Sequence, residues 1–273
     1  MTPGATRAPG RWAGRLLAAT GAATLRRIDA LLIFAAFSAT VAAAALRRES
    51  WRRPVRTALR TALHRVAVQS IPTILGAGIL LGLGLVTQVI YWLETAGQRQ
   101  LVGAIVVRLL VRELAPIVVG FIVLGRVGTG VLIDLGEARP RGWLRQLERQ
   151  GIDPVTLLVM PRVLGFAIGA FCLGTLLLVS TLMSGYLAGS ALGLITVPIW
   201  QFGQNVLLAM DVGDFVIPPV KCITIGMAVA LVCCATALAR VDESDELQRL
   251  VQRGFVQSAL AVLLVNGAFD LVG

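Results

Sequence analysis

Charged residues are scarce in this sequence of 273 residues. Asp, Glu, Lys and Arg make up 15% of it, against about 25% in an average soluble domain, and none of them occurs in residues 66–93 or 163–210. Hydrophobic residues make up 56% of the chain, and the mean hydropathy is +0.81. A helix crosses a bilayer with roughly 20 apolar residues. These runs therefore exclude a soluble globular protein and predict an all-α protein that spans the membrane several times.

Histidine and cysteine are also rare. The single histidine, His64, is not placed with any of the four cysteines in the spacing of a zinc site. All four cysteines lie inside apolar runs, so we expect small buried side chains rather than a metal site or a disulfide. They are Cys172, Cys222, Cys233 and Cys234.

The chain has one lysine, Lys221, in the segment PPVKCITIG. A nucleotide-binding P-loop requires the pattern G-x-x-x-x-G-K-[ST], because backbone amides and the lysine hold the phosphates, and the sequence contains no such pattern. The chain is therefore predicted not to be an enzyme and to hold no cofactor. If ATP drives it, a partner chain binds the ATP and Mg²⁺.

The positive charge is concentrated near the N-terminus. Residues 1–65 contain 12 Arg, one Asp and one Glu, which accounts for the net charge of +10, whereas residues 66–273 are neutral overall. A basic chain can indicate nucleic-acid binding. A basic segment beside membrane spans is more simply an anchor to anionic lipid, worth about 1 kcal/mol per Arg. We therefore expect membrane lipid, and no nucleic acid, as a partner.

The N-terminal region precedes the first long apolar run. Residues 1–27 are rich in Arg, Gly, Ala and Pro, which predicts a flexible basic arm. Residues 30–46 are uncharged but short for a span, and three alternatives stay open: a signal peptide, a sixth span or an interfacial helix. Arginines follow this run and resist export. We therefore favour an interfacial, amphipathic helical region over residues 28–65.

The rest of the chain, residues 66–273, predicts a membrane domain. Its five spans are expected at residues 66–92, 101–124, 163–190, 215–238 and 254–271. Gly78 and Gly82 in the first span have the GxxxG spacing that lets two helices approach closely in lipid. The alternative is the ordinary enrichment of glycine in membrane helices.

Arginine is distributed unevenly between the two sides of the predicted membrane. With the N-terminus in the cytoplasm, the segments on that side contain 20 Arg, and the segments on the other side contain only Arg99. Basic residues favour cytoplasmic loops. The sequence therefore predicts a multi-pass protein of the bacterial inner (cytoplasmic) membrane, with a cytoplasmic N-terminus and a periplasmic C-terminus.

Several charged residues nevertheless lie within predicted spans, at a cost of at least about 2.5 kcal/mol each on insertion scales. The pair Arg112-Glu113 precedes Pro116 near the middle of the second span. Neighbours in a helix point about 100° apart, so each should meet another helix or subunit. A substrate path or hinge, a structural ion pair, and arginines that reach the interface remain alternatives. The candidate substrate-path residues are Arg108, Arg112, Glu113, Pro116, Arg126 and Lys221.

The loop between the second and third spans predicts a short amphipathic helix over residues 140–150. Pro140 suits a helix start and Gly151 a helix end, and three apolar side chains fall on one face. The pattern leaves open whether this face lies on the membrane surface or in the groove of a partner. The residues of the helix are Arg141, Trp143, Leu144, Arg145, Leu147 and Glu148.

The segments RELAPIVVGFIVLGRVGTGVLIDLG (residues 112–136) and LERQGIDPVTLLVMPRVLG (residues 147–165) resemble the MlaE/YrbE permease family, the membrane subunits of Mce-associated lipid ABC transporters. So many matches in order are specific, and weaker similarity extends from about residue 66 to the C-terminus. The matches fall on Arg112, Glu113, Leu114, Pro116, Gly125, Arg126, Gly128, Asp134, Gly136, Gly151, Asp153, Pro154, Pro161 and Arg162.

The resemblance implies a homodimeric permease with an interfacial helix before five spans. It also implies a cytoplasmic ABC ATPase, a periplasmic Mce-domain lipid-binding protein and a phospholipid or other lipid substrate. Residues 140–150 would then be the coupling helix that docks in the ATPase. The basic segment 139–143 and the charged segment 241–257 depart from the family pattern, which leaves open a dedicated ATPase partner or a changed role.

The sequence therefore predicts a lipid permease driven by a separate ATPase. Two alternatives of other classes remain: a membrane scaffold of the same fold that transports nothing, and a proton-coupled secondary transporter that uses the Arg/Glu pair.

Overall fold

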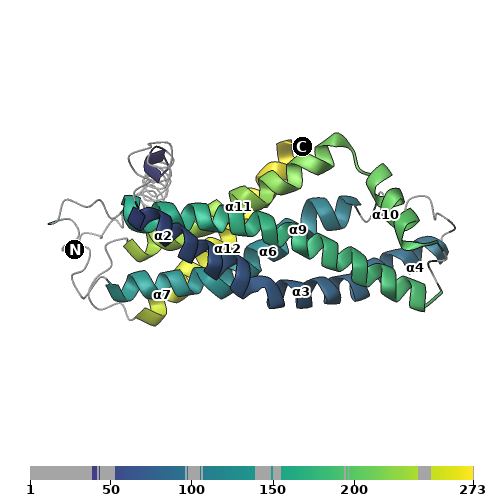
Figure 1. Ribbon diagram of the computed structural model, residues 1–273, viewed down its shortest axis with the longest axis horizontal. Helices are drawn as coiled ribbons and strands as arrows, with labels where there is room; N and C mark the ends of the chain where they lie inside the picture. The colour runs from purple at the N-terminus through teal and green to yellow at the C-terminus, as the bar shows by residue number, and fades with distance from the viewer. Residues whose placement is uncertain are drawn as a thin grey trace, which may run out of the picture.

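The computed structural model describes residues 53–95, 107–138, 155–193, 197–238 and 247–272, together with residues 39–41, 43, 97, 105, 149 and 195. Within these residues every regular element is a helix, and five helical stretches are long and apolar enough to cross a membrane. The predicted all-α membrane fold with five spans is confirmed. Figure 1 shows the helices running roughly along one axis, with α2 and α7 near one end and α4 and α10 near the other.

The first stretch runs without a break from Arg53 to Thr95. It comprises α2 (Arg53–Leu63), the π-helical turn η2 (His64–Val68), α3 (Gln69–Leu81), the π-helical turn η3 (Gly82–Val86) and α4 (Thr87–Thr95). The expected boundary at residue 65 therefore coincides with no helix end. Of the expected interfacial region 28–65, residues 28–38, 42 and 44–52 lie outside the described part of the chain.

The second stretch comprises η5 (Val107–Leu114), α6 (Ala115–Val123), η6 (Leu124–Gly128) and α7 (Thr129–Ala138). Its apolar part is Arg108–Glu137, whereas the sequence predicted residues 101–124. The apolar helix continues beyond residue 124, because Arg126 and Asp134 are the only charged residues between residue 124 and Glu137. Arg112 and Glu113 lie near the start of the described part of this stretch. Residues 101–104 and 106 lie outside the described residues, so the position of the pair near the middle of the span stays a prediction.

The remaining stretches begin with η7 (Val155–Val159) and α9 (Met160–Ala191), followed by α10 (Ile199–Leu208), α11 (Val212–Leu238) and α12 (Leu247–Val272). The helix α12 starts earlier than the predicted span 254–271, because its first residues pack on the bundle. Leu247 and Leu250 approach Gly136 of α7 so closely that a Cβ atom there would lie 2.9 Å from each leucine side chain.

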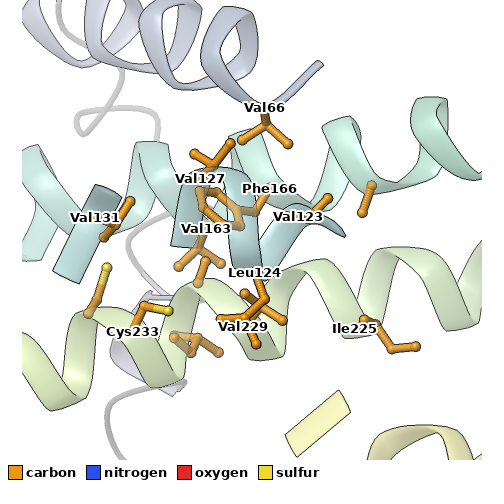
Figure 2. Packing of buried hydrophobic residues seen from close by; sticks show 14 of the residues in the cluster. Val66, Val123, Leu124, Val127, Val131, Val163, Phe166, Ile225, Val229 and Cys233 are labelled. Carbon is orange, nitrogen blue, oxygen red and sulfur yellow. The ribbon is translucent and has the colours of Figure 1, made fainter. Parts of the chain in front are cut away.

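The core lies between α9 and α11, which pack against each other and against most of the other long helices. Figure 2 shows Phe166 of α9, Leu124 of η6 and Val229 of α11 pointing toward one another, with Val66 closing the cluster from the first stretch. All four side chains are almost completely buried. Burying such a side chain contributes about 1.5–3 kcal/mol in water, but inside a membrane the gain comes from close packing instead.

The GxxxG prediction for the first span is confirmed. Ser184 Oγ of α9 donates a hydrogen bond of 3.2 Å to the carbonyl oxygen of Gly78. A Cβ atom at Gly82 would lie 2.3 Å from the carbonyl oxygen of Thr181. The backbone of the first stretch and that of α9 are therefore in direct contact.

The cysteines are all free thiols. Cys222, Cys233 and Cys234 are buried in the bundle, as expected, but Cys172 is exposed. The expectation of a buried side chain is wrong for Cys172, because it lies on the outward face of α9, and an apolar run does not reveal which of its faces turns inward.

Candidate functional site

Charged and polar side chains from three helical stretches converge near the start of α11 and the end of α12. Two come from η5, two from α11 and two polar ones from α12, although these segments are far apart in the sequence. We call this group the charge cluster. Its members are Arg112, Glu113, Asp214, Lys221, Asn266 and Asp270.

Lys221 is the centre of the charge cluster. Only 1% of the residue is exposed. Its Nζ forms an ion pair with Asp270, lies 3.6 Å from Glu113 Oε1, and donates a hydrogen bond of 3.1 Å to the backbone carbonyl oxygen of Arg112. A buried ammonium group is tolerated only when it is paired and hydrogen-bonded, and these three acceptors satisfy that need.

Pro116 explains why a backbone oxygen takes part. A proline has no N–H group and therefore cannot donate the helical hydrogen bond to the residue four positions earlier. Four positions before Pro116 is Arg112, whose carbonyl oxygen accepts the bond from Lys221. The π-helical geometry of η5 ends at Leu114, two residues before Pro116. Such local irregularities in helices are frequent at functional sites.

Asn266 links the two carboxylates that face Lys221. Its Nδ2 donates to Glu113 Oε2 at 3.1 Å and to Asp270 Oδ2 at 3.0 Å. Its Oδ1 is buried and has no hydrogen-bond partner in the described part of the chain. Asn266 and Asp270 lie four residues apart on α12, so the helix places both on one face.

Arg112 points to a different partner from that of Glu113. Its Nε forms an ion pair with Asp214 Oδ1 of α11, and the second oxygen of Asp214 accepts the backbone N–H of Asp211 at 2.9 Å. The adjacent residues Arg112 and Glu113 thus contact different groups on other helices, as their 100° separation predicts.

The charge cluster has a buried side and an open side. Lys221 and Asp214 are buried, whereas the side chains of Glu113, Asp270 and Arg112 are exposed by 37%, 35% and 28%. Three carboxylates against two basic groups leave one net negative charge. The arrangement can therefore tie η5, α11 and α12 together and also present polar atoms outward from otherwise apolar helices.

Two of the predicted path residues lie elsewhere. Arg108 is exposed on η5 and forms no ion pair within the described part of the chain. Arg126 lies in η6, and its Nη2 donates to the carbonyl oxygen of Gln69 of α3 at 3.2 Å. The spacing of Arg126 from the Arg112-Glu113 pair in the sequence does not reveal that it belongs to another contact.

The remaining family-motif residues that the structure describes lie in several different parts of the bundle. Asp134 pairs with Arg65 at 2.8 Å, and Arg162 donates to the carbonyl oxygen of Leu158 at 3.0 Å, next to Pro161 at the start of α9. The glycines Gly128 and Gly136 lie where other helices approach, whereas Gly125 faces open space. Gly151, Asp153 and Pro154 lie outside the described residues.

The expected coupling helix also lies outside the described residues. Of residues 139–150 only Arg149 is described, and it is helical and exposed. The contacts of Arg141, Trp143, Leu144, Arg145, Leu147 and Glu148 therefore remain predictions.

Three members of the charge cluster were not among the predicted site residues: Asp214, Asn266 and Asp270. The signal for two of them was available, because Asn266 and Asp270 are polar residues at helical i, i+4 spacing inside the last predicted span. For Asp214 the position at the start of a span offered no comparable signal.

The model of the family described as "Permease MlaE" matches residues 59–272. A permease protein of the intermembrane phospholipid transport system of Haemophilus influenzae is 26% identical over 203 residues, covering 74% of this chain and 77% of its own. A probable ABC transporter permease of Rickettsia typhi is 25% identical over 170 residues, and the chain spans 63% of its length. The chloroplastic protein trigalactosyldiacylglycerol 1 of Arabidopsis thaliana is 21% identical over 209 residues, covering 75% of this chain and 58% of its own.

Proposed function

The chain belongs to the MlaE permease family, and on this premise we propose that it is the membrane subunit of an ABC transporter for lipid. The transporter moves phospholipid or another lipid between the inner membrane and a periplasmic Mce-domain partner. A separate cytoplasmic ATPase supplies the energy, because the chain has no P-loop. The chain itself is not an enzyme.

The observation that carries the proposal is the charge cluster. Charges within membrane spans are rare and mark substrate paths, and here Lys221 is held by two carboxylates and by the backbone carbonyl oxygen of Arg112. The open side, formed by Glu113, Asp270 and Arg112, offers both signs of charge to a lipid headgroup. The apolar outer faces of the same helices suit its acyl chains.

The arginine distribution favours a periplasmic position for the charge cluster. With the N-terminus in the cytoplasm, the start of the second span and the end of the last span both face the periplasm. A lipid passed to or received from a periplasmic protein has to leave or enter the bundle on this side. The position of the cluster therefore fits the proposed exchange.

The proposed assembly is a homodimer of this chain with two cytoplasmic ATPase subunits and an Mce-domain protein. We propose that residues 140–150 are the coupling helix and that residues 28–65 lie partly in the membrane interface, preceded by a flexible basic arm over residues 1–27. We propose that residues 66–273 are the permease domain; the family model matches residues 59–272.

Purification of the tagged chain from its native membrane tests the proposal. Mass spectrometry of the eluate should identify an ABC ATPase, an Mce-domain protein and bound lipid, and the complex should hydrolyse ATP. A dimer that carries no ATPase would instead favour a scaffold. Transport that persists without ATP and collapses with the proton gradient would favour a secondary transporter.

A further inference from the structure

A cavity of about 500 Å³ lies between α2, α7 and the start of α9. Its size is within the range of about 300–1,000 Å³ that is typical of small-molecule sites. It is remote from the charge cluster: along the second stretch, Asp134 at the cavity follows Glu113 by 21 residues, which is roughly 30 Å of helix. That length matches the thickness of the hydrocarbon core, about 30 Å, so the two sites lie at opposite membrane surfaces.

The shape of the cavity follows from the small residues of α2. The face of α2 that lines the cavity carries Thr57, Ala58, Thr61 and Ala62, which leave the space that larger side chains would fill. Both threonine hydroxyl groups donate to backbone oxygens of α2, at 3.2 and 3.0 Å. These hydroxyl groups therefore occupy little of the cavity.

Three charged side chains stand around this space. Arg65 and Asp134 form an ion pair of 2.8 Å, with 52% and 44% of their side chains exposed, and Arg162 lines the wall formed by α9. A guanidinium group has five N–H donors. Within the described part of the chain, Arg65 and Arg162 use one each, toward Asp134 and the carbonyl oxygen of Leu158. Two basic groups against one acid leave a net positive charge and several unused donors.

The cavity lies where polar sequence meets apolar sequence. Arg65 directly precedes the uncharged run 66–93, and Arg162 directly precedes the uncharged run 163–210. Such positions correspond to the level of the lipid headgroups. The other walls are apolar and include Val131, Leu158 and Phe166. Basic groups beside an apolar wall at this level are suited to an amphiphile with an anionic head.

We propose that this cavity binds the phosphate headgroup of an anionic phospholipid, separately from the transport path. Arg65 and Arg162 donate hydrogen bonds to the phosphate oxygens, since guanidinium groups match phosphate geometry, and the apolar walls contact the first carbons of an acyl chain. With the N-terminus in the cytoplasm, the lipid comes from the cytoplasmic leaflet.

Photocrosslinking of the wild-type chain tests the site without relying on a variant that folds. The full-length protein is placed in phosphatidylcholine nanodiscs that contain phosphatidylglycerol with a diazirine near the ester end of one acyl chain. After illumination and digestion, mass spectrometry should find the lipid on residues 54–65 and 157–166, at least about fivefold more than diacylglycerol with the same diazirine chain. Equal labelling by the two lipids, or no labelling of these segments, would overturn the proposal.

Two variants test whether the positive charge at the cavity is what recognises the lipid headgroup. Arg162→Gln should reduce labelling of the cavity about fivefold, whereas Arg60→Gln, which removes the same charge from an exposed position on α2, should leave it unchanged. Equal loss in both would mean general attraction to the surface rather than a site. Glu113→Gln should not alter this labelling even if it stops transport, so the two proposals fail independently.

Two further experiments distinguish the lipid from other possible occupants of the cavity. Inorganic phosphate at millimolar concentration should not compete, because it lacks the acyl chain; competition would mean a site for a free anion and would contradict the proposal. Deletion of residues 1–52 should leave the labelling unchanged. A large increase after the deletion would mean that the N-terminal segment of the chain fills the cavity, and the lipid proposal would then be wrong.

Discussion

Replacing Lys221 by methionine removes the centre of the charge cluster with little change in volume. The substitution leaves Glu113 and Asp270 facing each other without their shared cation, and it removes the hydrogen bond from Lys221 to the carbonyl oxygen of Arg112. Asn266 still bridges the two carboxylates, but it carries no charge. We therefore expect the variant to be less stable than the wild type.

The magnitude follows from the burial of the groups. Removing one partner of a fully buried ion pair costs about 3–5 kcal/mol. Because about a third of each carboxylate side chain is exposed, we expect the lower end, about 3 kcal/mol. For a chain of this size 1 kcal/mol shifts the midpoint of thermal unfolding by about 2–4 °C, so the midpoint should fall by about 6 °C or more.

The assay is thermal unfolding of the purified protein in detergent, followed by size-exclusion chromatography with fluorescence detection. Arg108→Met is the matched control, since it removes a positive charge from an exposed position of η5, and its midpoint should not change. Adding Asp270→Asn to Lys221→Met should recover part of the loss, because it removes one of the two facing carboxylates. A midpoint for Lys221→Met within 1 °C of the wild type would refute the argument that these contacts stabilise the bundle.

Three other predictions concern packing, topology and coupling. Gly82→Ala should lower the midpoint of thermal unfolding, since an added Cβ would meet the backbone of α9 and overpacking costs about 1–3 kcal/mol. Gly84→Ala should not lower it, because Gly84 has open space around it. Equal midpoints for the two variants would contradict the close approach of the helices. Alkaline phosphatase fused to the C-terminus should be active and the same enzyme fused in the loop between the second and third spans inactive; the reverse pattern would invert the topology. Trp143→Ala combined with Leu147→Ala should release the ATPase in a pull-down through the tagged permease, since losing interface anchors costs about 2 kcal/mol or more. Arg145→Ala should release less of the ATPase. Full retention of the ATPase by the double variant would mean that the helix does not dock in the ATPase.

The spans were predictable because their signal is local. Residues 66–93 and 163–210 contain no charge, and a run of that length has few alternatives to a membrane helix. The glycine pair Gly78 and Gly82 was also informative, because small residues at that spacing have a direct geometric consequence. Each of these inferences needs only the residues of one segment.

The charge cluster was predictable only in part because it is assembled from distant segments. The cost of an unpaired charge in a span shows that Arg112, Glu113 and Lys221 need partners, but not which ones. Asp270 meets Lys221 only because α11 and α12 pack with a particular rotation about their axes. Neither that rotation nor the reach of Arg126 to Gln69 is contained in the pattern of any single helix.

The extent of the last helix illustrates a further limit. Residues 247–253 contain two arginines, and a charged segment between spans predicts a loop. The structure continues α12 through them because Leu247 and Leu250 pack on α7 at Gly136. Tertiary contacts of two leucines thus outweigh the local polarity, as packing commonly outweighs propensity.

ATP-dependent lipid transfer by the reconstituted transporter tests the central claim most directly. The wild-type chain and Glu113→Gln are each assembled with the ATPase and the Mce-domain partner, and transfer of a fluorescent phospholipid to or from that partner is measured. We expect Glu113→Gln to assemble and hydrolyse ATP normally but to transfer lipid about tenfold more slowly or worse, since a hydrogen bond to a charged group contributes about 1.5–3 kcal/mol. Normal transfer by a normally assembled Glu113→Gln complex would contradict the assignment of the charge cluster to the lipid path.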